Sequence, residues 1–301
     1  MLLNPDIRKD AFKNFLFVLP AFMIFTVFYI LPFMNLIWIS FHSWPGIGPM
    51  HFVGLRNFQE LATDTIWWDS IWHAGYITLI ALIFQNALAF SLALACDREI
   101  RMKRFYSVVF FIPPILSEVV VGILWNWILN AGVQNGQQVG LLNHFLAQIG
   151  FPNLIHSWLS DPKTALTCIA VVHSWKGFGW GFIILLAGLQ TIDRQLYEAA
   201  RVDGATSWRM FWNVTIPMMM PMIMVVVILT ILGSMQVFVL IVSLVENGLA
   251  HHTDVPVTVI LGSMHGSKQF GLACAQAVIF GTMLIAVSFA LKKLSNRVKQ
   301  V

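Results

Sequence analysis

Residues 15–38, "FLFVLPAFMIFTVFYILPFMNLIW", contain no charged side chain and are long enough to cross a membrane as one helix. About 20 mainly apolar residues span the roughly 30 Å hydrocarbon core of a bilayer as an α-helix. The rest of the 301-residue chain is similar, because 58% of its residues are hydrophobic and only 11% are charged. An ordinary soluble domain carries about 25% charged residues. The composition therefore predicts an integral membrane protein built of helices, since a barrel would show short alternating strands.

Five further stretches have the length of a transmembrane helix. The first span is too long for the core of a signal peptide and has no A-x-A-like cleavage site after it, so we expect it to be retained. We predict an all-α integral membrane protein with a tail at 1–14, a membrane domain at 15–291 and a basic tail at 292–301. The predicted spans are residues 15–38, 71–96, 105–129, 165–189, 218–242 and 271–291.

The basic residues predict the orientation, because short loops rich in Lys and Arg stay on the cytoplasmic side. Fourteen of the 18 Lys and Arg residues fall on one side only if there are six crossings with both ends inside. They are Arg8, Lys9 and Lys13; Arg98, Arg101, Lys103 and Arg104; Arg194, Arg201 and Arg209; and Lys292, Lys293, Arg297 and Lys299. We attribute the net charge of +4 to this asymmetry and predict no nucleic-acid partner.

The loop at 191–217 lies between two hydrophobic spans and contains the charged segment "EAARVDGATSWRMFWNVTIP" at 198–217. "DRQLYEAARV" is good helix-forming sequence, and Gly204 permits a turn that other residues resist. We expect Ser207 to cap a second short helix, with Pro217 and Pro221 at the entry to span five. The product would be a helix-turn-helix knob that can dock in a groove of a partner. Its apolar contacts would be Leu196, Tyr197, Met210, Phe211 and Trp212.

Two charges lie within the predicted spans, where lipid penalises them unless they face a cavity or a partner. Lys176 lies near the middle of span four, and Glu118 lies beyond the Pro113-Pro114 pair of span three. An ion pair between them is conceivable, either along a solute path or as a simple helix-packing contact. The same two interpretations apply to four polar residues, Gln85, Asn86, Asn126 and His173. They could line the path, but interhelical hydrogen bonding is the commoner use of such residues.

The sequence resembles the permeases of bacterial ABC importers, in the sugar-uptake subfamily that includes the maltose and glycerol-3-phosphate permeases. The resemblance is carried by the EAA segment, with Glu198-Ala199-Ala200, Asp203-Gly204-Ala205, Ile216-Pro217 and Pro221. It extends over nearly the whole chain, through "FVLPAFMIFTVFYILPF", "SFHSW", "FVGLRNFQEL", "RFYSVVFFIPPILSEVVVGILWNWILN" and "WKGFGWGFIILLAGLQTI".

The resemblance implies a non-catalytic subunit of the cytoplasmic (inner) membrane that works by alternating access. Its partners would be a second permease, usually a paralogue, two ABC ATPase subunits and an external solute-binding protein. ATP and magnesium would bind the ATPase, and no cofactor or metal is expected on this chain. In agreement, no G-x-x-x-x-G-K-[ST] phosphate loop occurs. The coupling helix for the ATPase would be formed by Glu198, Ala199, Ala200, Asp203 and Gly204.

The resemblance also indicates a solute path, because sugar contacts in the maltose permease come from the helices on both sides of the EAA loop. An alignment on Glu198 and Pro217 without gaps places these contacts on six residues, which are Gly177, Trp180, Thr230, Gly233, Ser234 and Val237. We add Lys176 to the path because of its position in the span. Gly233 and Val237 replace an aromatic and an amide residue, so we expect a different solute or pose. A second departure is "VENGL" at 245–249, where the family has T-x-G-G-P.

Two other classes remain open. An ion-coupled secondary transporter would use Lys176, Glu118 and His173 as a relay, but would leave the knob without a role. A membrane enzyme for lipid-linked sugars would need clustered acids or metal ligands. For that chemistry the loops offer only Asp64, Asp69, His251 and His252.

Overall fold

The computed structural model describes residues 5–97, 102–134, 137–245 and 251–298. Several residues named above lie outside these ranges: Arg98, Arg101, Lys299 and residues 246–249 of "VENGL". The side chains of Arg8, Lys9, Lys13 and Arg297 are likewise outside the description. The chain divides into two compact units, which are described separately below.

The first unit contains residues 1–64 and 260–282. Its elements include α1 (Pro5–Phe25), η1 (Thr26–Ile30), α2 (Leu31–Ser40), β1 (His42–Ser43), β2 (His51–Phe52) and α3 (Arg56–Thr63). β1 and β2 pair antiparallel with His42 opposite Phe52. The buried Asn57 amide donates to the carbonyls of Ser40 and His42 at 2.8 and 3.0 Å, which fixes the chain where it leaves α2.

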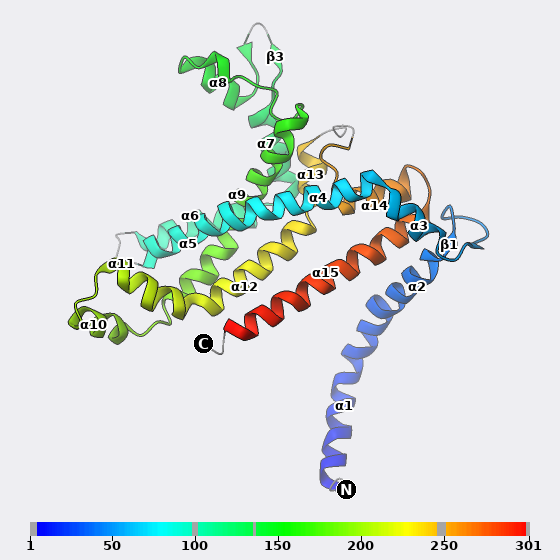
Figure 1. Ribbon diagram of the computed structural model, residues 1–301, viewed down its shortest axis with the longest axis horizontal. Helices are drawn as coiled ribbons and strands as arrows, with labels where there is room; N and C mark the ends of the chain where they lie inside the picture. The colour runs from blue at the N-terminus through cyan, green and yellow to red at the C-terminus, as the bar shows by residue number, and fades with distance from the viewer. Residues whose placement is uncertain (1–4, 98–101, 135–136, 246–250, 299–301) are drawn as a thin grey trace. The chain divides into compact units, whose positions relative to one another are not determined.

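The second unit contains residues 65–259 and 283–301, and it holds the helices on which the site is built. Its long helices are α9 and α12, and Figure 1 shows α4 and α5 as parts of a further long helical stretch. The division between the units falls within α14 (Pro256–His265) and α15 (Phe270–Val298). The other elements are α4 (Thr65–Ile80), η2 (Ala81–Gln85), α5 (Asn86–Asp97), α6 (Lys103–Ile115), α7 (Glu118–Leu129), β3 (Val133–Gln134), β4 (Gln137–Gln138), α8 (Leu141–Gln148), η3 (Pro152–Leu154), α9 (Pro162–Leu189), α10 (Arg194–Val202), α11 (Ser207–Met210), η4 (Phe211–Thr215), α12 (Ile216–Met235) and α13 (Val239–Leu244).

The described residues contain five continuous helical stretches that are long and apolar enough to cross a membrane, and one bent pair that can form a sixth. The continuous stretches are Asn14–Ser40, Thr65–Asp97, Pro162–Leu189, Ser207–Met235 and Phe270–Lys293. The chain is therefore an all-helical membrane protein with five or six candidate spans.

The bent pair corresponds to predicted span three, which is not one continuous helix. α6 and α7 meet at 95°. Pro113 and Pro114 remove two backbone donors from the last turn of α6, and Leu116 and Ser117 then adopt extended conformations with ψ near 140°. α7 begins directly afterwards, with Glu118 in its first turn. The proline pair was visible in the sequence, but the size of the bend was not.

Four other prolines, Pro20, Pro32, Pro217 and Pro221, stay inside continuous helical stretches, and two of them follow π-helical turns. A proline ring clashes with the carbonyl four residues earlier, which for Pro32 and Pro217 belongs to Phe28 and Asn213. Each of these residues lies in the middle of a five-residue π-helical turn, η1 or η4, whose wider backbone accommodates the clash. Pro217 therefore does not mark the start of span five, as the sequence suggested, because helical structure is continuous from Ser207.

Span five also ends earlier than residue 242. α12 stops at Met235, and Phe238 adopts φ −148° and ψ −60°, a non-helical conformation. α13 follows as a separate helix packed on α7, where Asn126 donates to the Leu244 carbonyl at 2.8 Å. Asn126 thus makes an interhelical contact, one of the two interpretations that the sequence left open.

The packing of α7 on α13 predicts a stability effect at Gly122. A Cβ atom at this position would meet Oγ of Ser243, with the Ser243 Cβ at 2.6 Å and its carbonyl carbon at 2.9 Å. We expect Gly122→Ala to destabilise the protein by about 1–3 kcal/mol, as overpacking does. The measurement is the thermal unfolding midpoint in detergent.

Gly75→Ala in α4 is the matched control, because a Cβ there would meet nothing within 4 Å. It should leave the midpoint unchanged or raise it slightly, as replacing a helical glycine does. Equal midpoints for the two variants would contradict the close α7–α13 contact.

Candidate functional site

α9 is the helix around which the second unit packs, since it contacts α4, α5, α6, α12 and α13. Its start is well defined by sequence. Asp161 caps it by accepting from the Lys163 N–H at 2.9 Å, and Pro162 occupies the first turn. This hydrogen bond, together with one between the Asp161 carboxylate and His156 Nε2, lowers the pKa of the Asp161 carboxyl group. α9 then remains helical for 28 residues.

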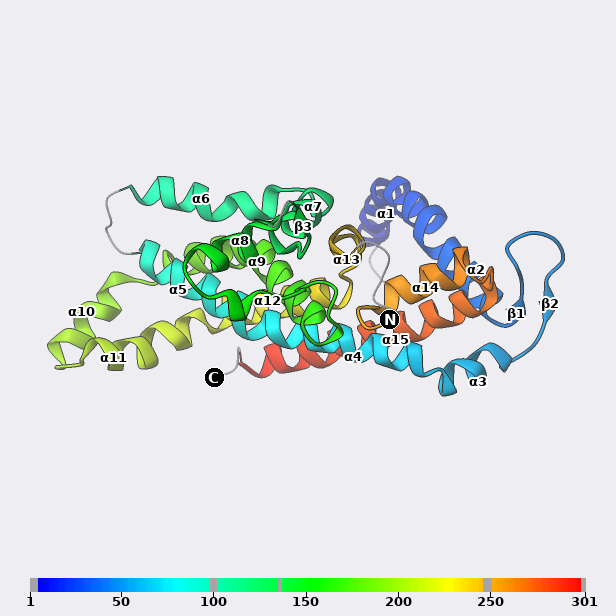
Figure 2. The same ribbon diagram turned by 90° about the horizontal axis from the view of Figure 1, so that it is seen from above.

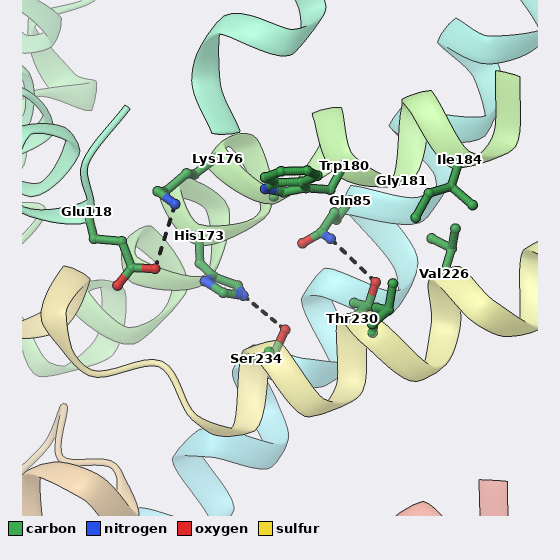
Figure 3. Close-up of a pocket in the computed structure, with 13 residues that line it drawn as sticks. Gln85, Glu118, His173, Lys176, Trp180, Gly181, Ile184, Val226, Thr230 and Ser234 are labelled. Atoms are coloured by element: carbon green, nitrogen blue, oxygen red, sulfur yellow. Dashed lines mark hydrogen bonds and ion pairs between the residues drawn. The ribbon is translucent and has the colours of Figure 1, made fainter. Parts of the chain in front are cut away.

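A cavity of about 350 Å³ lies along α9, within the range of small-molecule sites. Figure 3 shows residues of α9 opposite residues of α12, with Gln85 and Glu118 reaching in from other helices. The lining is Gln85, Glu118, His173, Lys176, Gly177, Trp180, Gly181, Ile184, Val226, Leu229, Thr230, Gly233 and Ser234. The cavity therefore combines an apolar half with a cluster of polar side chains.

The two intramembrane charges meet at one end of this cavity. Lys176 Nζ lies 3.6 Å from Glu118 Oε1 (Figure 3). The lysine side chain is 16% exposed and the glutamate side chain 39% exposed. Glu118 also lies in the first turn of α7, where the helix dipole favours a negative charge. The bend at Leu116–Ser117 is thus what brings the carboxylate to the cavity.

Hydrogen bonds between helices position the other polar side chains. His173 Nε2 lies 3.0 Å from Ser234 Oγ, which joins α9 to α12. Thr230 Oγ1 donates to Asn86 Oδ1 at 2.9 Å and accepts from Gln85 Nε2 at 3.4 Å. Gln85 and Asn86, whose amide groups both contact Thr230, lie at the end of the π-helical turn η2. Such turns often occur at functional positions.

Two amide atoms of Gln85 and Asn86 make no hydrogen bond to the described residues. Among the described side chains, Gln85 Oε1 and Asn86 Nδ2 are buried without a hydrogen-bond partner. Such an atom costs about 1–3 kcal/mol unless something satisfies it. Gln85 is only 7% exposed and lines the cavity, so this oxygen without a partner lies within the cavity wall. The sequence named Gln85 only as one of several polar candidates.

Gly177 allows Gln85 to occupy this place, since a Cβ at 177 would come within 2.5 Å of Gln85 Oε1. Trp180, one turn further along α9, is 56% exposed and packs edge-on against Phe111 with ring centroids 5.2 Å apart. Its indole therefore offers a broad apolar surface beside the polar cluster.

Six of the seven residues expected along the solute path line the cavity: Lys176, Gly177, Trp180, Thr230, Gly233 and Ser234. Val237 does not. It is 4% exposed and belongs to the hydrophobic core with Leu240 and Ile241. Thr230, Gly233 and Val237 would share a helix face, but α12 ends at Met235 and this periodicity stops with it.

The knob at 191–217 lies at one end of the second unit (Figure 2). Asp193 caps α10 by accepting from the Gln195 N–H at 2.9 Å. At the other end, Gly204 has φ +74°, and the N–H groups of Gly204 and Ala205 donate to the carbonyls of Arg201 and Ala200. This pattern is a Schellman motif, in which glycine takes the left-handed position.

The second helix of the knob differs from the expectation. Thr206, and not Ser207, is its cap, because the Thr206 hydroxyl accepts from the Arg209 N–H at 3.4 Å. Of the five expected apolar contacts, Leu196 and Trp212 are exposed, whereas Tyr197, Met210 and Phe211 are partly buried. The most exposed apolar side chains here are Val202 at 88% and Trp208 at 69%, which periodicity alone did not single out.

The knob is attached to the cavity through two helices. α10 follows α9 after a four-residue turn, and α11, η4 and α12 form one helical stretch. The Tyr197 hydroxyl lies 2.9 Å from Thr215 Oγ1, which ties α10 to the same stretch. The knob is thus joined by continuous backbone to the two helices that carry Lys176, Trp180, Thr230 and Ser234.

The membrane-enzyme alternative would need clustered acids or metal ligands, and the described part of the chain shows no such metal-binding cluster. No group of three or more His, Cys, Asp or Glu side chains there is placed to hold a metal ion. His251 instead contacts the nearby Asp254 carboxylate at 2.6 Å.

Comparison with known proteins identifies relatives over most of the sequence. Residues 85–300 match the family described as "Binding-protein-dependent transport system inner membrane component". A probable starch degradation products transport system permease protein of Thermoanaerobacterium thermosulfurigenes is 28% identical, over 93% of this chain and 94% of the relative. A sulfoquinovosyl glycerol transport system permease protein of Agrobacterium fabrum is 30% identical, over 76% and 72% of the two chains.

A similar fold is present in a solved structure, a bacterial alginate ABC transporter in complex with alginate pentasaccharide-bound periplasmic protein. One of its chains superimposes with a TM-score of 0.81, 24% identity and 98% coverage of both chains. The family match covers well over half of the sequence and includes every residue that lines the cavity. The chain therefore belongs to the family of inner membrane components of binding-protein-dependent transport systems.

Proposed function

We propose that this chain is the permease subunit of an ABC importer and forms half of the translocation path for a sugar or a related polyol or glycoside. The cavity between α9 and α12 is the solute path, and the knob is the seat of a separate ATPase subunit. The chain itself catalyses no reaction. ATP with magnesium binds the ATPase, whose closure rocks the knob and the attached helices.

The mechanical link between cavity and knob is the observation that carries the proposal. The helical stretch Ser207–Met235 contains the second knob helix at one end and Thr230, Gly233 and Ser234 at the other. A coupling element needs such continuity, because a flexible joint would absorb the movement. The Glu198–Gly204 segment is exposed apart from the half-buried Ala200, and so is available to a partner.

The polar groups of the cavity suit a polyhydroxylated solute. Gln85 Oε1 offers an acceptor, Ser234 and Thr230 offer hydroxyl groups, and Trp180 offers an apolar face for a sugar ring. The name of the curated relative from Thermoanaerobacterium thermosulfurigenes, which refers to starch degradation products, supports the same class of solute.

The assembly that this function requires has several further components. The chain works with a second permease, expected to be a paralogue, with two ATPases and with an external solute-binding protein. It spans the bacterial cytoplasmic (inner) membrane several times, with both termini and the knob in the cytoplasm, as the basic residues favour. The exposed Val202 and Trp208 side chains extend the ATPase-facing surface beyond the EAA residues.

An ion-coupled transporter is the second candidate, because Lys176, Glu118 and His173 line one cavity. The two mechanisms differ in their source of energy. In proteoliposomes that contain the whole complex and its solute-binding protein, we expect uptake of a saccharide from a panel of maltose, trehalose, cellobiose and raffinose to require ATP. Uptake driven by a proton or sodium gradient without ATP would instead support the ion-coupled mechanism.

Gly204 provides a specific test of coupling. A residue other than glycine in the left-handed conformation costs about 1–2 kcal/mol. A Cβ at 204 would meet nothing within 4 Å, so backbone strain is the only effect within this chain. We expect Gly204→Leu to insert normally but to lower ATP-dependent uptake roughly tenfold, since about 1.4 kcal/mol corresponds to a factor of ten.

Gly204→Asn is the matched control, because asparagine tolerates the left-handed conformation. It should retain most of the uptake at equal expression. Normal uptake by Gly204→Leu would contradict the role of the turn in coupling.

Gln85 tests the solute path. Gln85→Leu keeps the side-chain volume but removes the free acceptor and the hydrogen bond to Thr230. Two lost hydrogen bonds of about 0.5–1.5 kcal/mol each predict a fall of roughly tenfold in uptake at low solute concentration. Gln236→Leu is the control, since Gln236 is exposed outside the cavity and bonds the Leu232 carbonyl. Equal uptake by both variants would remove Gln85 from the path.

A further inference from the structure

We infer that the part of the solute that passes this cavity carries no net charge. The inference rests on the proposed function, because it takes the cavity between α9 and α12 as the solute path. It narrows the solute to uncharged saccharides or polyols, as opposed to those with carboxylate, phosphate or sulfonate groups.

The first step is the charge inventory of the cavity. Among the 13 lining residues, three have ionisable side chains: Glu118, His173 and Lys176. The 3.6 Å ion pair cancels the charges of Glu118 and Lys176. The His173 imidazole contacts Ser234 Oγ through Nε2, and an imidazole is mainly uncharged at pH 7. The lining as a whole is therefore neutral, and no further cation in it is free to receive an anion.

The second step is access. Lys176 is the more buried member of the pair, and Glu118 is more than twice as exposed. An anionic solute that approaches the ammonium group therefore meets a carboxylate, and must displace it or lie beside it. Both arrangements place like charges together in a partly dehydrated site, where charges interact more strongly than in water. A cation meets the more exposed carboxylate first, but the charge of this carboxylate is already balanced by Lys176.

The third step is what remains available to a neutral solute. The polar residues Gln85, Thr230 and Ser234 in the cavity wall are uncharged, and a hydrogen bond between any of them and a hydroxyl group of the solute changes no charge. The ion pair then serves as a charge filter at one end of the cavity, while hydroxyl recognition occurs further along α9 and α12. This division of roles explains why two charges are retained in a membrane without leaving a charged path.

A cysteine inside the cavity measures this selectivity without knowledge of the natural solute. Gly233 lines the cavity, and a Cβ there would meet nothing within 4 Å. Gly233→Cys is introduced into a chain in which Cys96, Cys168 and Cys274 are replaced by alanine, and the importer is assembled with its partner subunits. The probes are three methanethiosulfonates of similar size: anionic sulfonatoethyl, neutral hydroxyethyl and cationic trimethylammonioethyl. Each rate is divided by the rate of the same reagent with a free thiol in solution.

With the ion pair intact, we expect the anionic and cationic reagents to react no faster than the neutral one. Glu118→Gln, which exposes the Lys176 charge, should raise the anionic-to-neutral ratio by about tenfold, and Lys176→Gln should raise the cationic-to-neutral ratio similarly. The double variant with both Glu118→Gln and Lys176→Gln should return both ratios to their values with the ion pair intact. An anionic preference with the pair intact, or a ratio that Glu118→Gln leaves unchanged, would overturn the inference while the solute path stands.

A different result would count against the proposed function itself. If none of the three reagents modifies the introduced thiol of the Gly233→Cys importer, with or without ATP, although all react after denaturation, the cavity is no aqueous path. The comparison with the pair intact needs no charge variant, so the inference is still tested if Glu118→Gln fails to fold.

Discussion

The need to satisfy every backbone hydrogen bond within hydrocarbon is the constraint on which this structure depends. It makes the spans helical, and it restricts non-helical backbone to places where protein or a cavity covers it. The break at Leu116–Ser117 brings Glu118 to the cavity, and the break after Met235 sends α13 back against α7. Where continuity is needed instead, at Pro32 and Pro217, π-helical turns absorb the clash and the helix continues.

Breaks and continuous helices occur in different parts of the second unit. Two helices run without a break between the knob and the cavity, whereas neighbouring helices at the cavity are bent or contain a π-helical turn. Ser207–Met235 and Pro162–Leu189 remain unbroken between knob and cavity, and in the proposed mechanism these helices would carry a displacement at Gly204 to the cavity. The polar side chains lie where these helices meet a bent or bulged neighbour. Gln85 is the last residue of the π-helical turn η2, and Glu118 follows the bend after α6. Changes in the angle between α9 and α12 would therefore alter the cavity without unfolding its walls.

The sequence was sufficient for the class of fold, because long apolar runs and the placement of Lys and Arg depend on local chemistry that a sequence displays. The resemblance, through the alignment on the EAA segment, indicated Trp180, Thr230 and Ser234, and Lys176 stood out as a charge within a span; all four line the cavity. It misplaced Val237, because a gapless alignment assumes that α12 continues beyond Met235. Gln85 could not be distinguished from Asn126, because only packing decides which amide keeps a free oxygen and which bonds a carbonyl. The Thr206 cap is one residue from the expected Ser207, an ambiguity inherent in adjacent hydroxyl residues.

The most direct test of the account is the co-purification of the tagged chain in mild detergent, with each partner identified by mass and peptide sequence. We expect a polypeptide with a phosphate-loop motif to be recovered, to be lost when Glu198 and Gly204 are replaced together, and to be retained with Gly75→Ala. Recovery of the chain without any ATPase in several detergents, while it transports solute after reconstitution, would contradict the central claim that this knob receives energy from a separate ATP-hydrolysing subunit.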